Sequence, residues 1–168
     1  MKANQMPIIN NVTRLLDSQK IKYTAYELPA EKLGALETAE LLKVDPSVVF
    51  KTIVVIREKP TSSLKGKKPL LVVVPGNSTV DLKLVASALN EKKVHLPTER
   101  EAEELTGLQA GGISPLALIN KGFQVIIDSS AQSFDAIHVS GGQRGLNIKL
   151  PVSDLAKLAN ARFAKVSH

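Results

Sequence analysis

Cysteine and tryptophan are absent from this chain of 168 residues, and other aromatic residues are few. Without cysteine the protein can form no disulfide, no thiolate metal site and no cysteine nucleophile. Long apolar runs are lacking too: the longest is Leu70–Val74, far shorter than the roughly 20 residues that a membrane-spanning helix needs. The N-terminus carries no apolar signal segment. We therefore expect no membrane association and a cytoplasmic location.

Positive charge is the main bias in what is present. The 22 Lys and Arg residues exceed the 16 Asp and Glu residues, for a net charge of +6. Such an excess favours polyanionic partners, bound through their phosphates. It is concentrated in Arg57–Lys68, where Lys65, Lys67 and Lys68 are candidates for contact with a nucleic-acid backbone. The plainer alternative for this segment is a solvated loop between two strands.

Hydrophobic periodicity and capping residues predict one domain, residues 1–168, in which helices and strands are mixed. Helices are expected at Ile8–Gln19, at Glu37–Val44, after Asp81, after the capping box of Thr98 and Glu101, and at Ser153–Leu158. Strands are expected at Ile21–Ala25, Phe50–Ile56, Leu70–Val74, Lys93–Leu96, Phe123–Ile127, Ile137–Ser140, Leu146–Leu150 and Arg162–Val166. Because no regular βαβ rhythm appears, this order predicts an α+β fold with a mixed or antiparallel sheet.

Common catalytic motifs are missing. The three histidines, His95, His138 and His168, fit no metal-binding pattern. The sequence contains no G-x-S-x-G elbow, no P-loop and no dinucleotide-binding glycine motif after a strand. We expect neither a metal nor a cofactor, and a reaction catalysed by this chain would have to proceed without a nucleophile from the protein.

The segment Gly107–Leu118 contains more turn-forming residues than a plain connection needs. Gly111 and Gly112 have no Cβ, so the backbone there is free to adopt a positive φ and to approach a ligand closely. Pro115 restricts Ser114 to an extended conformation. Such a loop can present consecutive backbone N–H groups to an oxygen atom of a bound molecule. A tight turn between a helix and a strand is the plainer alternative.

Lys51 is a charge near the start of an otherwise apolar strand. Alternation puts Phe50 and Thr52 on one face of that strand and Lys51 and Ile53 on the other. Because both faces are largely apolar, we expect an inner strand. Lys51 could then lie at the mouth of a pocket and supply a cation for a phosphate or a developing oxyanion. The alternative is a lysine that extends from the strand end into water.

Three motifs in register resemble the YbaK/EbsC family, the free-standing relatives of the prolyl-tRNA synthetase editing domain. They are Val49-Phe50-Lys51-Thr52, Gly111-Gly112-Ile113-Ser114-Pro115-Leu116 and Val139-Ser140-Gly141-Gly142-Gln143-Arg144-Gly145-Leu146. The resemblance covers nearly the whole chain. It implies an α/β fold built on a mixed, largely antiparallel, barrel-like sheet flanked by helices. It also implies a trans-editing deacylase that clears misacylated tRNA, and the most similar branch acts on Cys-tRNA(Pro).

The same resemblance assigns roles to residues. It makes Lys51 the catalytic lysine and the acceptor end of an aminoacyl-tRNA the substrate. The substrate-binding residues that it implies are Phe50, Thr52, Gly111, Gly112, Ile113, Ser114, Pro115, Gly141, Gly142, Arg144 and Gly145, with Tyr26 as a pocket tyrosine. Many members have Tyr where this chain has His138 and Lys where it has Gln143, and some have an acid at Asn147. We therefore assign Asn147 no catalytic role.

Editing chemistry suits a chain without a nucleophile. A synthetase pocket rejects an amino acid that differs by about one methylene only about 10–200-fold, so a second, hydrolytic site is useful. The resemblance implies that the substrate's own thiol, with a pKa of about 8.5, attacks the ester and leaves as a thiolactone. An Ala-tRNA(Pro) or broader small-amino-acid deacylase is the alternative. In a different class, the protein would be a non-catalytic tRNA-binding module or an accessory of prolyl-tRNA synthetase, the candidate protein partner.

Overall fold

The computed structural model describes residues 8–57 and 69–168. Lys65, Lys67 and Lys68 lie outside these residues. The α-helices are α1 (Asn11–Ser18), α2 (Ala35–Leu42), α3 (Leu82–Ala88), α4 (Glu99–Thr106) and α5 (Val152–Ala159). The 3-10 helices are η1 (Pro46–Val48), η2 (Pro115–Leu118) and η3 (Ser129–Ser133). The strands are β1 (Thr24–Glu27), β2 (Phe50–Arg57), β3 (Leu70–Pro75), β4 (Val94–His95), β5 (Gln124–Asp128), β6 (Ala136–Ser140), β7 (Leu146–Pro151) and β8 (Arg162–Ala164).

Capping side chains set where the helices begin. The predicted capping box at α4 is confirmed, since Thr98 Oγ1 accepts the Glu101 N–H and Glu101 accepts the Thr98 N–H. Helix α1 begins at Asn11 rather than at Ile8, because the Asn10 side chain accepts the Thr13 N–H at 2.9 Å and caps the helix there. Each capping bond satisfies an N–H group that has no partner within the helix.

Helix α2 starts earlier than the apolar pattern predicted. Glu37 was expected to begin it, but the Glu37 carboxylate accepts the N–H of Gly34 at 3.0 Å, and the helix begins at Ala35. The strand expected at Ile21–Ala25 lies at Thr24–Glu27 instead, where the register of β1 against β7 begins with Thr24 opposite Lys149. Pairing with a distant strand, which no local pattern shows, fixes that boundary.

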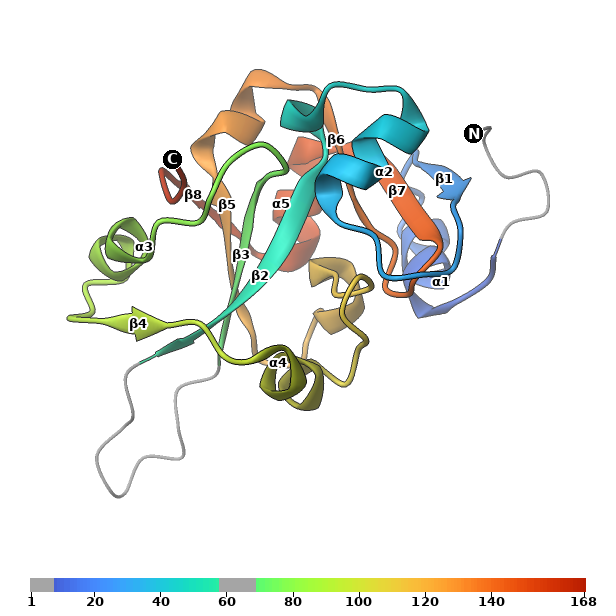
Figure 1. The fold of residues 1–168 in the computed structure, drawn as a ribbon. Helices are drawn as coiled ribbons and strands as arrows, with labels where there is room; N and C mark the ends of the chain where they lie inside the picture. The colour runs from blue at the N-terminus through green and yellow to red at the C-terminus, as the bar shows by residue number, and fades with distance from the viewer. Residues whose placement is uncertain (1–7, 58–68) are drawn as a thin grey trace.

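The strands form two sheets (Figure 1). One has the order β1-β7-β6 and is antiparallel throughout. The other has the order β4-β2-β3-β5-β8, with β2 antiparallel to β3 and β4, and β3, β5 and β8 parallel. An isolated parallel bridge between Val49 and His138 connects the start of β2 to β6. The predicted fold class, α+β with a mixed and largely antiparallel sheet and flanking helices, is confirmed.

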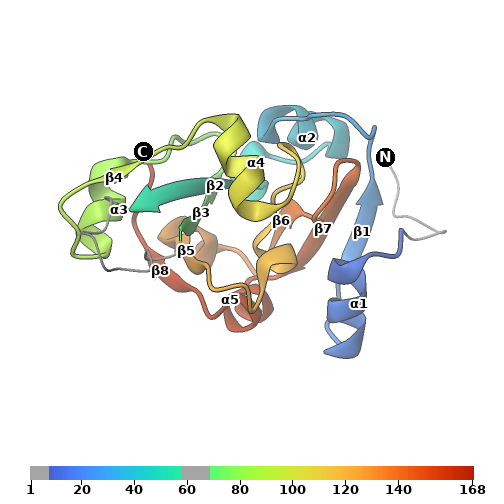
Figure 2. The same cartoon turned by 90° about the horizontal axis from the view of Figure 1, so that it is seen from below.

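The longest apolar run, Leu70–Val74, forms most of strand β3. This strand is apolar throughout because both of its faces are buried. Leu71 and Val73 belong to the larger core cluster, which also contains buried residues of the three-stranded sheet such as Ile148. Leu70 and Val72 belong to the second cluster, which lies against α3. Period-two alternation thus sends neighbouring side chains to opposite sides of the sheet. The view from below shows how the helices surround the two sheets (Figure 2).

The sheet order confirms the expected inner strand, because β2 lies between β4 and β3. However, β4 pairs only with Ile56 and Arg57 at the far end of β2. Over Phe50–Val55 the described pairings of β2 are with β3 alone. The half of β2 that carries Lys51 therefore has an open edge, which leaves room for a cavity.

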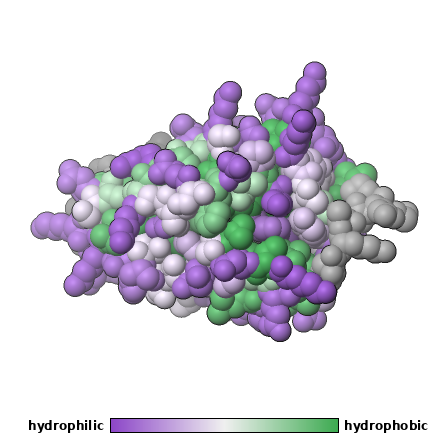
Figure 3. All heavy atoms as spheres, turned by 90° about the horizontal axis from the view of Figure 1, so that it is seen from above, coloured by the Kyte–Doolittle hydropathy of each residue, from purple (hydrophilic) through white to green (hydrophobic). Residues whose placement is uncertain are grey.

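The surface seen from above is mostly polar, with apolar atoms gathered in smaller areas between charged side chains (Figure 3). Large apolar residues that remain exposed are Ile9, Leu36, Leu96 and Leu105. Within residues 8–57 and 69–168, no helix has the length and apolar character needed to span a bilayer.

Candidate active site

A cavity of about 470 Å³ lies against the open edge of β2. Distant parts of the chain line it: the segment from Leu28 to Ala35, the first residues of β2, the start of α4, the segment Gly107–Leu118 (the glycine loop) and the turn between β6 and β7. Its outer part includes the apolar side chains of Leu33, Leu96 and Pro97. The candidate site is therefore formed only when these segments come together.

Lys51 supplies an uncompensated positive charge to this cavity. Its side chain is half-buried, and burial lowers the pKa of its ammonium group from the ordinary value. The described chain offers this ammonium no hydrogen bond and no ion pair. A cation kept in a cavity without an internal partner is available for an anionic ligand.

Thr52, the next residue of β2, adds a second polar group without a partner. Its Oγ1 is buried and makes no hydrogen bond among the described residues. Buried hydroxyl groups are almost always hydrogen-bonded, so an unbonded one is uncommon. Because neighbouring residues of a strand point to opposite faces, Thr52 Oγ1 does not lie beside the Lys51 ammonium.

The adjacent glycines Gly111 and Gly112 were both expected to be free to adopt a positive φ, but only one of them does. Gly111 lines the cavity and has a φ of +90°, as expected. Gly112 does not have a positive φ. Instead it is buried, and a Cβ added there would lie 2.9 Å from the Cα and the carbonyl carbon of Gln143. Gly112 is thus needed for contact between the glycine loop and the β6–β7 turn.

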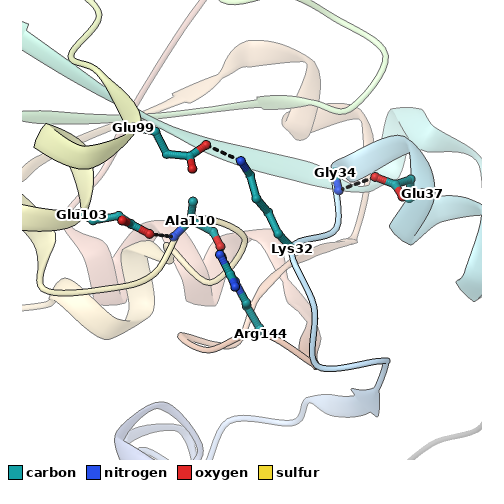
Figure 4. Close-up of polar contacts among 7 residues, drawn as sticks. All are labelled: Lys32, Gly34, Glu37, Glu99, Glu103, Ala110 and Arg144. Carbon is teal, nitrogen blue, oxygen red and sulfur yellow. Dashed lines mark hydrogen bonds and ion pairs between the residues drawn. The ribbon is translucent and has the colours of Figure 1, made fainter.

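Polar contacts connect the segments around the cavity (Figure 4). Lys32, from the segment before α2, forms an ion pair with Glu99 at the start of α4, and both residues line the cavity. Below this pair, Arg144 of the β6–β7 turn donates to the carbonyl of Ala110 at 2.7 Å, and Glu103 of α4 accepts the Ala110 N–H at 2.8 Å. Four segments around the cavity are therefore bonded to one another: the segment before α2, α4, the glycine loop and the β6–β7 turn.

The second glycine motif shapes the turn between β6 and β7. The Gly141 N–H donates to the Leu146 carbonyl at 2.8 Å, and the Gly142 N–H donates to Ser140 Oγ at 3.2 Å. Gly145, with a φ of +88°, accepts the Leu28 N–H at 2.9 Å and lines the cavity. Local bonding and close packing thus account for these glycines, and Gly145 also reaches the site.

A buried histidine lies behind the cavity. His138 is 2% exposed, its Nδ1 lies 2.8 Å from Oδ1 of Asn147, and its ring packs against Tyr26 with 5.5 Å between centroids. Burial lowers the pKa of His138; the Asn147 bond opposes this, and the charge of Lys149 adds to it. Asn147 lines the cavity, so the hydrogen bond to Asn147 connects His138 to the site.

The pKa of His138 predicts an acid-sensitive stability. The folded protein binds this proton less well than the unfolded chain, so the free energy of unfolding decreases as the pH falls below about 6.5, until the folded histidine also titrates. We expect His138→Gln to flatten that part of the stability curve in urea titrations from pH 7.5 to pH 5. His95→Gln, at an exposed histidine, is the control. Equal slopes in the wild type and His138→Gln would contradict the prediction.

The structure brings together only some of the residues that the sequence singled out. Predicted residues that line the cavity are Phe50, Lys51, Thr52, Gly111, Ile113 and Gly145. Those outside its lining are Tyr26, Gly112, Ser114, Pro115, Gly141, Gly142 and Arg144. Ser114 is extended, as predicted, and its hydroxyl accepts the Leu116 N–H to cap η2. Among these residues, Gly112 and Arg144 connect the glycine loop to the β6–β7 turn.

Sequence reasoning missed several cavity residues. They are Lys32, Leu33, Leu96, Glu99, Ala110, Ser140 and Asn147, among others. For Asn147 a signal existed, because a polar residue interrupts the apolar strand between Leu146 and Ile148. For Lys32 and Glu99 no local pattern could indicate that the two segments meet.

The comparison with known proteins identifies the family of this chain. The profile of the aminoacyl-tRNA editing domain family matches residues 30–158. The chain belongs to the aminoacyl-tRNA editing domain family. It is 33% identical over 159 residues to the Enterococcus faecalis protein named "Putative Cys-tRNA(Pro)/Cys-tRNA(Cys) deacylase EbsC", covering 94% of this chain and 92% of that protein. The predicted resemblance to the YbaK/EbsC family, and with it an aminoacyl-tRNA editing enzyme, is confirmed at the level of the family.

Two further relatives extend the comparison. A proline–tRNA ligase of Limosilactobacillus reuteri is 28% identical over 104 residues, which are 58% of this chain and 18% of the ligase. A solved structure described as a "putative trans-editing enzyme for prolyl tRNA synthetase" superposes with a TM-score of 0.76 at 22% identity. The match covers 96% of this chain and 99% of that one, and at this identity it supports the fold alone.

Proposed function

We propose that this protein is a trans-editing aminoacyl-tRNA deacylase that acts in the cytoplasm, with Cys-tRNA(Pro) as its favoured substrate. The observation that carries the proposal is the half-buried Lys51, without a partner among residues 8–57 and 69–168, in a cavity of about 470 Å³ in a chain of the editing family. The terminal adenosine with its aminoacyl group is a ligand of suitable size for such a cavity. The relative named as a Cys-tRNA(Pro)/Cys-tRNA(Cys) deacylase supports cysteine as the amino acid.

In the proposed reaction the substrate supplies the nucleophile. The cysteine sulfur attacks its own ester carbonyl, a C–S bond forms, and the ester C–O bond breaks. The thiol proton passes to the ribose oxygen, and the products are a thiolactone and uncharged tRNA. Lys51 holds the terminal phosphate or stabilises the thiolate, and backbone N–H groups of the glycine loop hold the carbonyl oxygen. Electrostatic groups placed in advance in this way usually contribute most to catalysis.

A panel of charged tRNAs tests the proposal. We expect the purified protein to deacylate Cys-tRNA(Pro) faster than Ala-tRNA(Pro) or Ser-tRNA(Pro), and to spare Pro-tRNA(Pro). Cys-tRNA(Cys) shows whether this chain or a synthetase partner, prolyl-tRNA synthetase being the candidate, selects the tRNA. Preferential release of alanine would favour the alternative substrate. Binding of tRNA without release of any amino acid would overturn catalysis in favour of the non-catalytic tRNA-binding or accessory module.

Salt dependence tests the basic segment as a tRNA contact. We expect tRNA affinity to fall steeply with salt concentration, because each neutralised phosphate contributes about 0.9 to the slope of log K against log salt for a duplex and about 0.7 for a single strand. Replacing Lys65, Lys67 and Lys68 together with Gln should lower both the affinity and the slope in filter-binding titrations. The matched control replaces Lys92, Lys93 and Lys121, which are exposed elsewhere. An unchanged slope in the first variant would make the segment a solvated loop.

A further inference from the structure

Ala110 is held by side chains at both of its backbone polar groups. Glu103 Oε2 accepts its N–H at 2.8 Å, and Arg144 Nε donates to its carbonyl at 2.7 Å. Glu103 comes from α4 and Arg144 from the β6–β7 turn, so the two bonds reach Ala110 from different elements (Figure 4). Ala110 itself is 8% exposed. Charge-assisted bonds of this kind are stronger than bonds between neutral groups, and they fix the orientation of the peptide.

The Arg144 bond determines where the next N–H group points. Within a trans peptide unit the C=O and the following N–H point in opposite directions, so the Gly111 N–H points away from Arg144. In Figure 4 the Ala110 carbonyl is turned toward Arg144, on the side away from the Lys32–Glu99 pair that lines the cavity. Among the described residues the Gly111 N–H makes no hydrogen bond, although Gly111 lines the cavity. This N–H group is therefore available to donate a hydrogen bond to a ligand.

Close packing adds to the constraint. A Cβ on Gly111 would lie 3.2 Å from Lys32 Cα and 3.6 Å from Arg144 Cγ, and the φ of Gly111 is +90°. The stem of Arg144 and the backbone at Lys32 therefore both pack close to the Cα of Gly111, on the side that a Cβ would occupy. Within a chain of hydrogen bonds each bond polarises the next, so donation by Arg144 to the Ala110 carbonyl also makes the Gly111 N–H a better donor.

We propose that Arg144 and Glu103 are positioning residues, which aim the Gly111 N–H at the ester carbonyl oxygen of the bound aminoacyl-tRNA. This inference rests on the proposed deacylase function and replaces direct substrate binding as the role of Arg144. As the ester is attacked, negative charge develops on the carbonyl oxygen, and a donor fixed in advance stabilises it without reorganisation. Neither Arg144 nor Glu103 touches the reacting atoms; each acts through the backbone of the glycine loop.

Arg144→Met tests the role of Arg144, because methionine keeps an apolar stem beside Gly111 but removes the donor. We expect the kcat for deacylation of Cys-tRNA(Pro) to fall at least 10-fold, toward the 10²–10³-fold typical of a lost oxyanion donor, while KM changes about 3-fold or less. Arg162→Met is the matched control: Arg162 donates to the backbone carbonyl of Ala88 at 3.0 Å, away from the cavity. It should keep the wild-type kcat.

The split between kcat and KM separates positioning from other roles. Loss of a tRNA-binding charge alone would raise KM and leave kcat unchanged. A purely structural role would lower the melting temperature and leave the activity of each folded molecule unchanged. Glu103→Leu should reproduce the effect on kcat, whereas Glu104→Leu, at the next and exposed position of α4, should not. If the wild type deacylates its substrate and Arg144→Met retains its kcat, the positioning role is overturned. If the wild type deacylates no charged tRNA, the proposed function fails, and this inference fails with it.

Discussion

Lys51→Met is expected to lower the rate of deacylation by about 10²–10³-fold, the cost of one lost electrostatic donor in the transition state, while the protein stays folded. The Lys51 ammonium makes no bond within the described chain, so its removal breaks none there. Burial lowers its pKa, which means that folding disfavours the charged form, so the substitution should not reduce stability. Single-turnover deacylation of Cys-tRNA(Pro) beside thermal melts provides the measurement, with Lys92→Met as the exposed-lysine control.

The same lysine predicts a pH dependence. Because its pKa lies below the ordinary value in the folded protein, Lys51 loses its charge at a lower pH than an exposed lysine does. Ionisation of the substrate thiol raises the rate in alkaline solution, so the effect of Lys51 is read from the ratio of the wild-type rate to the Lys51→Met rate, which should decline as the pH rises and Lys51 loses its charge. If a folded Lys51→Met protein deacylates at the wild-type rate, Lys51 has no catalytic role and simply extends into the cavity.

Gly112→Ala is expected to damage both stability and activity. The new methyl group would lie 2.9 Å from backbone atoms of Gln143, so the glycine loop must move away from the β6–β7 turn. Such overpacking costs about 1–3 kcal/mol, which lowers the melting temperature by roughly 2–12 °C for a chain of this size. The displacement also pulls Ala110 from Arg144, so the activity of each folded molecule should fall. This expectation replaces the view that a positive φ at Gly112 is what matters.

Gly107→Ala is the matched control for this prediction. Gly107 has a φ of +73°, and a Cβ there would meet no atom within 4 Å. The substitution should therefore cost only backbone strain, about 1–2 kcal/mol, and each folded molecule should keep its wild-type deacylation rate. If Gly112→Ala melts like the wild type and deacylates at the same rate, close contact between Gly112 and Gln143 is needed neither for stability nor for activity.

Much of the fold was readable from local patterns. The capping box at Thr98 and Glu101 and the doubly buried β3 follow from residues close together in the sequence. The 3-10 helix η2 was missed, although Ser114 before Pro115 is a cap followed by a proline at the first helical position. The open edge of β2 could not be predicted, because it depends on how far the distant β4 extends along the strand.

The sequence by itself determined the family, the mixed α+β class and the catalytic candidate, because motif spacing and apolar alternation are properties of neighbouring residues. Only the tertiary structure decided which residues line the cavity. It places Gly112 and Arg144 outside the cavity lining and brings Lys32, Glu99 and Asn147 into it. These placements depend on contacts between segments far apart in the chain, and the direction of a side chain or an N–H group is fixed only once those segments pack together.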